Sequence, residues 1–242
     1  MRNSRLFRSI QQTPGPTGDL PGLENTENLV IPLSQRSLLI ASGNRHKHVE
    51  ICRELSLEDG ALLRPADLES KLGIPAPDPI EDGKTLLENA IIKATAFSLW
   101  SGLPSLADDT GLMVEALDGA PGVHAARWAG ENASYQDNVT KLLDQLGELP
   151  EHKRQAEFRC VLVLCDGDQV ILSVEEKCEG RISPTAQGQD GFGYDPVFIP
   201  GGETRTFAEM NPTEKDAVSH RGKAVRRFAM AYEAFGSTGG QC

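Results

Sequence analysis

Three adjacent side chains with oxygen atoms, Asp108, Asp109 and Thr110, follow a short apolar run at residues 103–107. Oxygen ligands are those that Mg²⁺ prefers in proteins, usually together with the phosphate oxygens of a substrate. We expect the apolar run to be a strand that ends at these residues, with the two carboxylates on opposite faces and in different roles. A turn rich in aspartate accounts for the same pattern, so the motif alone leaves both interpretations open.

A second polar group, SGNRHK at residues 42–47, lies where a strand is expected to meet a helix. The apolar run at residues 37–42 predicts a buried strand, and the spacing over residues 44–58 predicts a helix with Asn44 as its N-cap. Backbone N–H groups at a helix start, together with the Lys47 ammonium, can bind phosphate oxygens. A capped helix with a solvated Lys47 fits equally well, and the Walker phosphate-binding pattern is absent.

A third carboxylate, Glu81, precedes a helix that the apolar spacing predicts over residues 84–99. A carboxylate at this position interacts favourably with the helix dipole, so Glu81 could have a purely structural role. The functional alternative is that Glu81 joins Asp109 as a second metal ligand. We interpret Asn89 and Lys93, inside this helix, as part of its solvent-facing side.

The glycine-rich loop at residues 188–195 contains the aromatic residues Phe192 and Tyr194 and ends at Asp195. Glycines let a backbone approach a flat ligand, and an aromatic ring such as Phe192 offers a face on which a base can stack. A loop that packs its own aromatic residues is an equally good interpretation.

Basic residues gather near the C-terminus, where Lys215 is followed by His220 and Arg221. Ser219 is a good N-cap, which places His220 and Arg221 in the first turn of a helix. The helix dipole disfavours cations there unless an anion or an acceptor accompanies them. This local conflict favours a role for both residues in ligand binding.

The remaining elements set the fold class. Further strands are predicted at residues 61–64, 157–165, 170–178 and 196–199, a further helix at residues 133–146, and a proline-rich loop at residues 65–79. The turn at residues 166–168 joins two of these strands into an antiparallel hairpin, which argues against a purely parallel sheet. We predict a mixed α/β fold of two lobes with a cleft between them.

Composition excludes several classes of protein. The formal net charge of −11 over 242 residues argues against binding to long nucleic acid. Five cysteines without a CxxC spacing indicate a reducing compartment and neither a zinc site nor a disulfide framework. No apolar run approaches the length of a membrane span, so we predict a cytoplasmic protein. Residues 1–35 lack periodicity and are predicted to be a flexible extension before a domain at residues 36–236.

Taken together, five blocks resemble the inosine triphosphate pyrophosphatase family, which removes non-standard purine nucleoside triphosphates from the nucleotide pool. The matching blocks, in the family's order, are residues 42–47, 81–94, 106–130, 191–200 and 214–224. The resemblance implies an elongated mixed sheet flanked by helices, two lobes with a central nucleotide cleft, a homodimer and Mg²⁺ as cofactor. Its implied substrates are ITP, dITP and XTP, which are hydrolysed to the monophosphate and pyrophosphate.

The resemblance also implies roles for individual residues. Asp109 would be the general base, and Glu81 and Asp109 would hold the magnesium ion. The implied substrate-binding residues are Ser42, Gly43, Asn44, Arg45, His46, Lys47, Thr110, Phe192, Gly193, Tyr194, Asp195, Lys215, His220 and Arg221. Whether Asp108 or Asp109 is the base stays open without geometry. Two other classes remain as alternatives: a nucleotide-binding regulator without turnover, and an RNA-binding module, which the net charge disfavours.

Overall fold

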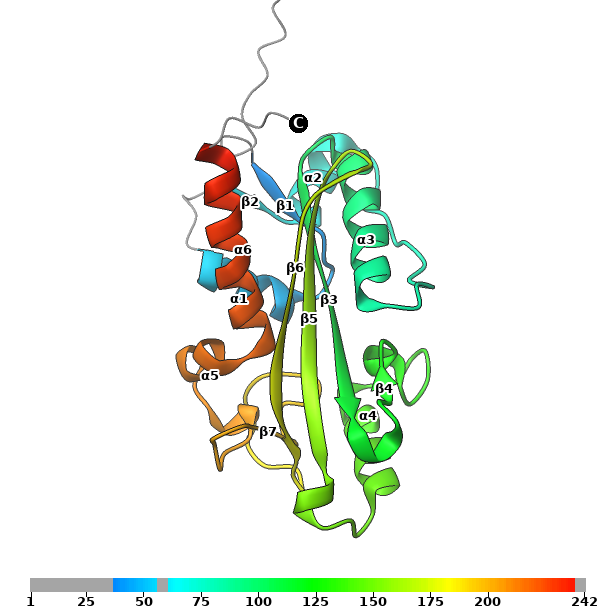
Figure 1. The fold of residues 1–242 in the computed structure, drawn as a ribbon. Helices are drawn as coiled ribbons and strands as arrows, with labels where there is room; N and C mark the ends of the chain where they lie inside the picture. The colour runs from blue at the N-terminus through cyan, green and yellow to red at the C-terminus, as the bar shows by residue number, and fades with distance from the viewer. Residues whose placement is uncertain (1–36, 56–60, 238–242) are drawn as a thin grey trace, which may run out of the picture. The chain divides into compact units, whose positions relative to one another are not determined.

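A mixed sheet of seven strands forms the centre of the computed structural model, which describes residues 37–55 and 61–237 (Figure 1). The predicted extension at residues 1–35 lies outside the described residues. The strands are β1 (Leu38–Ile40), β2 (Leu62–Leu63), β3 (Ser105–Val114), β4 (Pro121–Gly122), β5 (Gln155–Asp166), β6 (Gln169–Ile182) and β7 (Phe198–Pro200). Their order in the sheet is β2-β1-β3-β5-β6-β7, and β4 pairs with β3.

The sheet is parallel at one edge and antiparallel elsewhere. Strand β1 runs parallel to both β2 and β3, whereas β3, β5, β6 and β7 pair in antiparallel fashion. The predicted hairpin is therefore confirmed as β5–β6, with longer strands than expected. All ten residues of β3 pair with β5, so this strand is held along its whole length.

Six helices flank the sheet in the described part of the chain. They are α1 (Arg45–Leu55), α2 (Pro65–Leu72), α3 (Leu86–Ser101), α4 (Tyr135–Leu146), α5 (Pro212–Val218) and α6 (His220–Ser237). Helices α1 and α6 cover one face of the sheet and α3 covers the other (Figure 1). None of the helices in the described ranges has the length and apolarity that a membrane crossing requires.

The alternation of side chains along β3 and β5 explains this layering. Leu106 and Leu162 pack with α1 and α6, whereas their neighbours Ala107 and Val161 pack with α3. Towards the other end of the same strands, a separate core is built around Leu112, among others. The two cores on opposite faces at one end of these strands and the separate core at the other end agree with the predicted arrangement of two lobes.

Two expectations about these elements are wrong. Residues 65–79 contain helix α2, which begins with Pro65 at its first position and ends at Gly73 in the left-handed conformation. Asp108, Asp109 and Thr110 do not follow the end of a strand but lie in the middle of β3. A strand can continue through these polar residues because each finds a charged or hydrogen-bonding partner on a neighbouring element, as described below.

The junction of α5 and α6 needs glycine at position 222. Ser219 caps α6 as predicted, since its Oγ accepts a hydrogen bond from the backbone N–H of Gly222 at 3.0 Å. A Cβ atom at position 222 would lie 1.9 Å from the backbone oxygen of Asp216 in α5. Glycine therefore permits the close packing that places the start of α6 against the sheet.

We predict that Gly222→Ala destabilises the fold by about 2 kcal/mol, because the backbone of α5 must move away from α6. Urea denaturation measures this as a lower midpoint. Met230→Ala is the control, since its side chain in the same helix is 66% exposed and its loss should change stability by less than about 0.5 kcal/mol. Equal midpoints for Gly222→Ala and the wild type would show that the backbone of α5 leaves room for a Cβ atom at position 222.

Candidate active site

A cleft of about 780 Å³ lies beside the middle of β3. The structure brings the predicted residues together there. The sequence-predicted site residues that line it are Ser42, Gly43, Asn44, Arg45, Lys47, Glu81, Asp109, Thr110, Phe192, Gly193, Tyr194, Asp195, Lys215, His220 and Arg221. His46 is not part of the lining but stacks on Phe192 at its edge. A cleft of this size can hold a ligand the size of a nucleotide.

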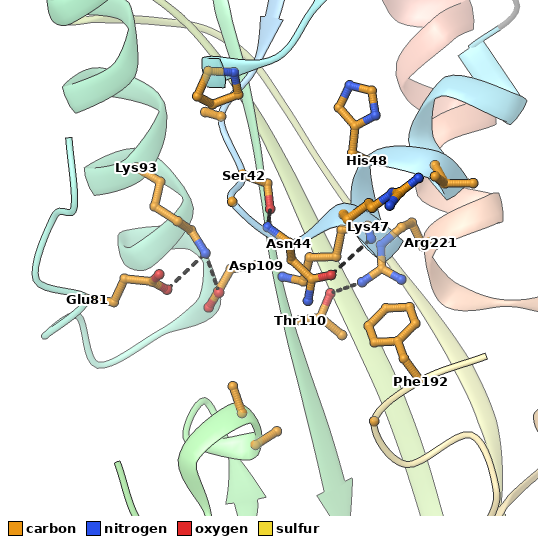
Figure 2. A pocket seen from close by; sticks show the side chains of 18 of the residues that line it. Ser42, Asn44, Lys47, His48, Glu81, Lys93, Asp109, Thr110, Phe192 and Arg221 are labelled. Atoms are coloured by element: carbon orange, nitrogen blue, oxygen red, sulfur yellow. Dashed lines mark hydrogen bonds and ion pairs between the residues drawn. The ribbon is translucent and has the colours of Figure 1, made fainter. Parts of the chain in front are cut away.

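Two carboxylates at one side of the cleft share a single ammonium group. Lys93 Nζ lies 2.9 Å from Glu81 Oε2 and 2.8 Å from Asp109 Oδ1 (Figure 2). Asn89 Nδ2 donates to the other oxygen of Asp109 at 3.4 Å, and Arg127 holds the backbone oxygen of Glu81 at 2.8 Å. The interpretation of Asn89 and Lys93 as solvent-facing is wrong, because both are buried.

Burial raises the pKa of Asp109, although the nearby cations of Lys93 and Lys47 oppose the shift. For Lys93 the balance is reversed. Burial alone would lower its pKa, but the carboxylates of Asp109, Asp108 and Glu81 outweigh burial and raise it. Lys93 is therefore protonated at neutral pH, and Asp109 binds a proton more readily than an ordinary aspartate.

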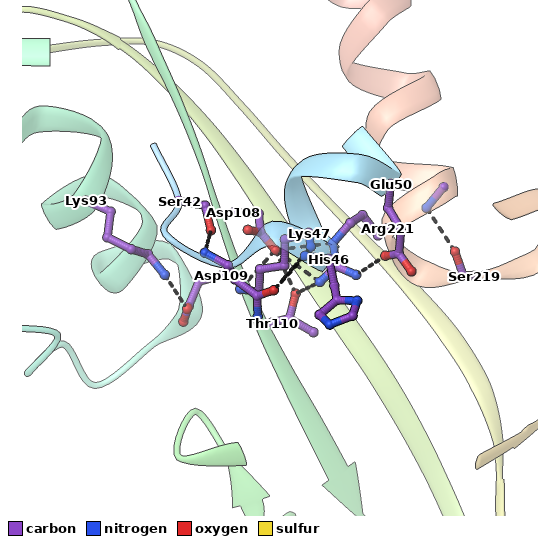
Figure 3. A network of polar contacts seen from close by, with 12 residues as sticks. Ser42, His46, Lys47, Glu50, Lys93, Asp108, Asp109, Thr110, Ser219 and Arg221 are labelled. Carbon is purple, nitrogen blue, oxygen red and sulfur yellow. Dashed lines mark hydrogen bonds and ion pairs between the residues drawn. The ribbon is translucent and has the colours of Figure 1, made fainter. Parts of the chain in front are cut away.

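Asp108 points to the opposite side of β3, as predicted, and is a different kind of carboxylate. Its Oδ2 lies 3.1 Å from Lys47 Nζ and 3.1 Å from Arg221 Nη2, and it also accepts from Thr110 Oγ1 at 3.2 Å (Figure 3). Burial alone would raise its pKa, but the cations of Lys47, Arg221 and Lys93 outweigh burial and hold it well below the usual range. Asp108 is thus a permanently charged partner for two cations.

The start of α1 has the geometry that the sequence predicts. Asn44 Oδ1 accepts hydrogen bonds from the backbone N–H groups of His46 at 3.0 Å and Lys47 at 3.4 Å, which makes Asn44 the N-cap. Ser42 Oγ accepts from the Asn44 backbone at 3.2 Å and fixes the turn. Lys47 is not solvated, since its ammonium pairs with Asp108 and its side chain is 17% exposed.

Glu50, on the buried side of α1, joins two cations from distant segments. Its carboxylate lies 2.6 Å from Lys215 Nζ and also pairs with Arg221 Nη1. Lys215 in turn pairs with Asp195 Oδ2 at 2.7 Å. The anions that the first turn of α6 requires therefore come from the protein itself, from Glu50 and Asp108.

His220 does not add a further cation. Its side chain is buried, and its ring stacks on Phe158 with 4.5 Å between the ring centroids and 14° between the planes. Burial lowers the pKa of His220 well below its usual value, and the positive charges of Arg221 and Lys215 lower it further. A neutral imidazole explains how His220 is tolerated at a helix start.

The two aromatic residues of the 188–195 loop behave differently. Tyr194 is 5% exposed and donates its hydroxyl hydrogen to the backbone oxygen of Ala125 at 2.9 Å, so it belongs mainly to the core. Phe192 lies at the edge of the cleft, where its ring faces His46 and Tyr135. The interpretation of a loop that packs its own aromatic residues therefore holds for Tyr194, whereas stacking of a base on Phe192 stays a prediction.

The donor set at Glu81 and Asp109 fits a magnesium ion. Within residues 37–55 and 61–237 no group of three or more His, Cys, Asp or Glu side chains could hold a metal by itself. Two carboxylates nevertheless converge on one cation, the Lys93 ammonium. Mg²⁺ is commonly held by one or two carboxylates, with water and substrate phosphates as the other ligands.

Comparison with known proteins decides the family. A model of the Ham1 family matches residues 38–231. This chain belongs to the Ham1 family. A dITP/XTP pyrophosphatase of Cutibacterium acnes is 42% identical over 199 residues, covering 81% of this chain and 96% of the relative. That of Vibrio cholerae is 40% identical over 200 residues, covering 82% of this chain and 97% of the relative.

Solved structures of Ham1 proteins share the fold. A HAM1 protein from Coxiella burnetii superimposes with a TM-score of 0.71 at 35% identity, covering 82% of this chain and 99% of its own. The nucleoside-triphosphatase / dITP/XTP pyrophosphatase from Mycobacterium abscessus superimposes with a TM-score of 0.63 at 39% identity. The match covers 79% of this chain and 98% of that structure. These likenesses confirm the predicted mixed sheet flanked by helices.

Three buried polar residues in or beside this Ham1 cleft, Glu50, Lys93 and Asn89, were missed or misjudged from the sequence. Glu50 precedes the buried Ile51 and follows Lys47 by three positions, so helical spacing could have placed it on the inward side of α1. Lys93 and Asn89 lie on the same side of α3 as the buried Ala90 and Ala94. The same spacing applied to polar as well as apolar residues would have indicated their burial.

We predict that Glu50→Gln destabilises the protein by about 3 kcal/mol, because it leaves Lys215 and Arg221 buried without their shared anion. Glu54→Gln is a matched control on the same helix. Its partner Arg226 has a side chain that is 40% exposed, so its loss should cost less than about 1 kcal/mol. Urea denaturation at neutral pH measures both, and equal losses would contradict the assignment of Glu50 as the centre of the buried charges.

The difference between wild type and Glu50→Gln should depend on pH. Burial alone would raise the pKa of Glu50, but Arg221 and Lys215 outweigh burial and lower it. The stabilisation by this carboxylate is therefore fully present above its unfolded pKa of about 4.3 and is lost as pH falls through the folded value.

Proposed function

We propose that this chain hydrolyses non-standard purine nucleoside triphosphates, ITP, dITP and XTP, to the monophosphate and pyrophosphate. The observation that carries the proposal is the combination within one cleft of a side lined by the cations of Lys47 and Lys93 and a side lined by the Phe192 ring. In the view of Figure 2, Lys47 and Thr110 lie between the Lys93–Asp109 pair and Phe192. Its relatives in Cutibacterium acnes and Vibrio cholerae are named dITP/XTP pyrophosphatases.

In this proposal the triphosphate lies along the cation side of the cleft. The dipole of α1 favours an anion at the turn formed by residues 42–47, although Asn44 Oδ1 already accepts from the N–H groups of His46 and Lys47. Lys47 and Lys93 add two positive charges close to it. Phosphoryl transfer depends mainly on positioning and on neutralising the phosphate oxygens, which is what these groups supply.

Glu81 and Asp109 would hold Mg²⁺, which when bound would neutralise charge on the phosphate oxygens. The protein's own residues determine the rest of the chemistry. Arg127 fixes the backbone next to Glu81, and Lys93 keeps both carboxylates at one place.

Asp109 is the general base in this proposal. A water oxygen attacks the α-phosphorus while Asp109 accepts the proton, and the bond from the α-phosphorus to the oxygen that bridges to the β-phosphorus breaks. Its raised pKa makes Asp109 the better proton acceptor of the two neighbouring carboxylates. Asp108 is unsuited to the role, because the cations of Lys47 and Arg221 lower its affinity for a proton and occupy its Oδ2.

The purine base would stack on Phe192, with Arg221 near its edge. Arg221 donates from Nε and Nη2 to Asp108, from Nη2 also to Thr110 Oγ1, and from Nη1 to Glu50, so its free donor capacity is limited to Nη1. Hypoxanthine and xanthine present a carbonyl acceptor at C6, where adenine presents an amino donor. A donor-only guanidinium at that edge would favour the first two bases.

A substrate panel tests the function directly. The purified full chain is incubated with Mg²⁺ and ITP, dITP, XTP, GTP or ATP, and pyrophosphate release is measured. The proposal expects kcat/KM to be highest for the first three. Binding of ITP without release of pyrophosphate would instead identify a nucleotide-binding regulator.

A homodimer and a cytoplasmic location are further parts of the proposal, both implied by the family resemblance. Light scattering coupled to size-exclusion chromatography measures the oligomeric state.

We predict that Asp109→Asn lowers turnover by about 10²-fold or more, because it removes the base and one charge at the proposed metal site. Asp108→Asn is the matched control on the other face of β3. It should chiefly lower stability, since it leaves Lys47 without its anion and Arg221 with Glu50 alone. Steady-state kinetics and thermal melting separate the two effects, and Asp109→Asn activity within a few-fold of wild type would eliminate Asp109 as the base.

The pH profile of Lys93→Met tests how Lys93 acts on Asp109. The Lys93 cation lowers the pKa of Asp109, so its removal should raise that pKa. Because the base must be ionised, the acid limb of kcat/KM should move to higher pH by about one unit or more. Lys84→Met, which removes an exposed lysine just before α3, is the control and should leave the limb in place. An unmoved limb in Lys93→Met would mean that Lys93 does not tune the base.

A further inference from the structure

The contacts of the Phe192 ring are not explained by the roles proposed above. The imidazole of His46 lies parallel to this ring, with 5.1 Å between the centroids and 19° between the planes. Tyr135, the first residue of α4, lies 5.9 Å from the same ring at 51°. The ring that would stack on a base is thus already stacked on a side chain of the protein.

Two other neighbours of the ring are fixed. Lys215 Nζ and Arg221 Cζ lie 5.0 and 5.5 Å from the Phe192 centroid, and their side chains are 7% and 3% exposed. Both take part in the buried ion pairs with Glu50. Moving either would leave buried charges unpaired, so a base cannot reach the ring by displacing them.

His46, in contrast, is exposed at the second position of α1. Its backbone N–H donates to Asn44, but among the residues that the structure describes no hydrogen bond or ion pair holds its imidazole. The ring can therefore turn away from Phe192 at the cost of one aromatic contact. A further link, from Asn44 Nδ2 to the Tyr135 hydroxyl at 3.0 Å, joins the same turn to α4.

We propose that His46 is a displaceable cover on the stacking face of Phe192, and that the purine ring of the nucleotide takes the place of its imidazole. This inference rests on the proposed function through Phe192 as the base-stacking residue. The apparent affinity for the nucleotide equals the affinity of the uncovered form multiplied by the fraction of molecules in which the Phe192 ring is free. Every base that stacks on Phe192 displaces the same imidazole. The cover therefore lowers the binding affinity of all these nucleotides by the same factor.

Two variants of His46 with opposite expectations test the cover. Calorimetry in the presence of Mg²⁺ measures the binding of inosine 5′-monophosphate and of inorganic tripolyphosphate, which has no base. His46→Ala should bind the nucleotide about two- to tenfold more tightly than the wild type, the range expected for one aromatic contact. His46→Phe keeps a ring over Phe192 and should bind no more tightly than the wild type. Neither variant should bind tripolyphosphate more tightly.

His152→Ala, which removes an exposed histidine far along the chain, is the control and should bind both probes as the wild type does. Weaker binding of the nucleotide to His46→Ala would overturn the proposal, because the base would then lie between the two rings. Unchanged binding would overturn it as well, and equal changes for both probes would assign His46 to the phosphates. Binding needs no turnover, so a failure of the hydrolysis proposal would appear separately, as a wild type that binds the nucleotide but releases no pyrophosphate from ITP.

Discussion

The burial of a balanced set of charges beside β3 is the constraint on which the cleft depends. Three carboxylates, Asp108, Glu50 and Asp195, alternate with the three cations of Lys47, Arg221 and Lys215. Removing one ion from water costs several kcal/mol unless a partner compensates it. Each charge therefore fixes its neighbour, and the chain of pairs ties the start of α1, the middle of β3, the 188–195 loop and the α5–α6 junction to one another.

The two faces of β3 use charge in different ways as a result. On the Asp108 face the ion pairs are closed among protein groups, and the carboxylate stays ionised. On the Asp109 face one lysine serves two carboxylates, and the side chain of Glu81 is 32% exposed. The second face keeps capacity for a proton, whereas the ion pairs of the first hold Lys47 and Arg221 in fixed positions beside the cleft. Adjacent residues of one strand can divide these tasks because their side chains point in opposite directions.

Much of this arrangement could be predicted from local patterns. The cap at Asn44, the β5–β6 hairpin and the opposite directions of Asp108 and Asp109 depend on neighbouring residues, which the sequence displays. Helical spacing places Lys93 on the buried side of α3, but the local pattern does not show its partner, because another element supplies that carboxylate from 16 positions away. The continuation of β3 through Asp108 likewise depends on partners from distant elements, since Lys47 of α1 and Arg221 of α6 compensate its charge. Helix α2 could have been predicted from local patterns, since Pro65 stands at its first position and Gly73 at its C-terminal end. The prolines that follow the helix belong to the loop alone.

The walls of the cleft therefore differ in how easily they can change. Opening the side formed by Lys215, Arg221 and Asp108 would separate buried charges, and the free energy for that is large compared with one stacking contact. At the rim, the contacts between His46 and Phe192 and between Asn44 and Tyr135 are one ring stack and one hydrogen bond, both partly exposed to water. A nucleotide that enters the cleft must change some existing contact. The changes of lowest free energy lie at the rim, where the proposal places the base, whereas the charged groups that would meet the phosphates keep their positions.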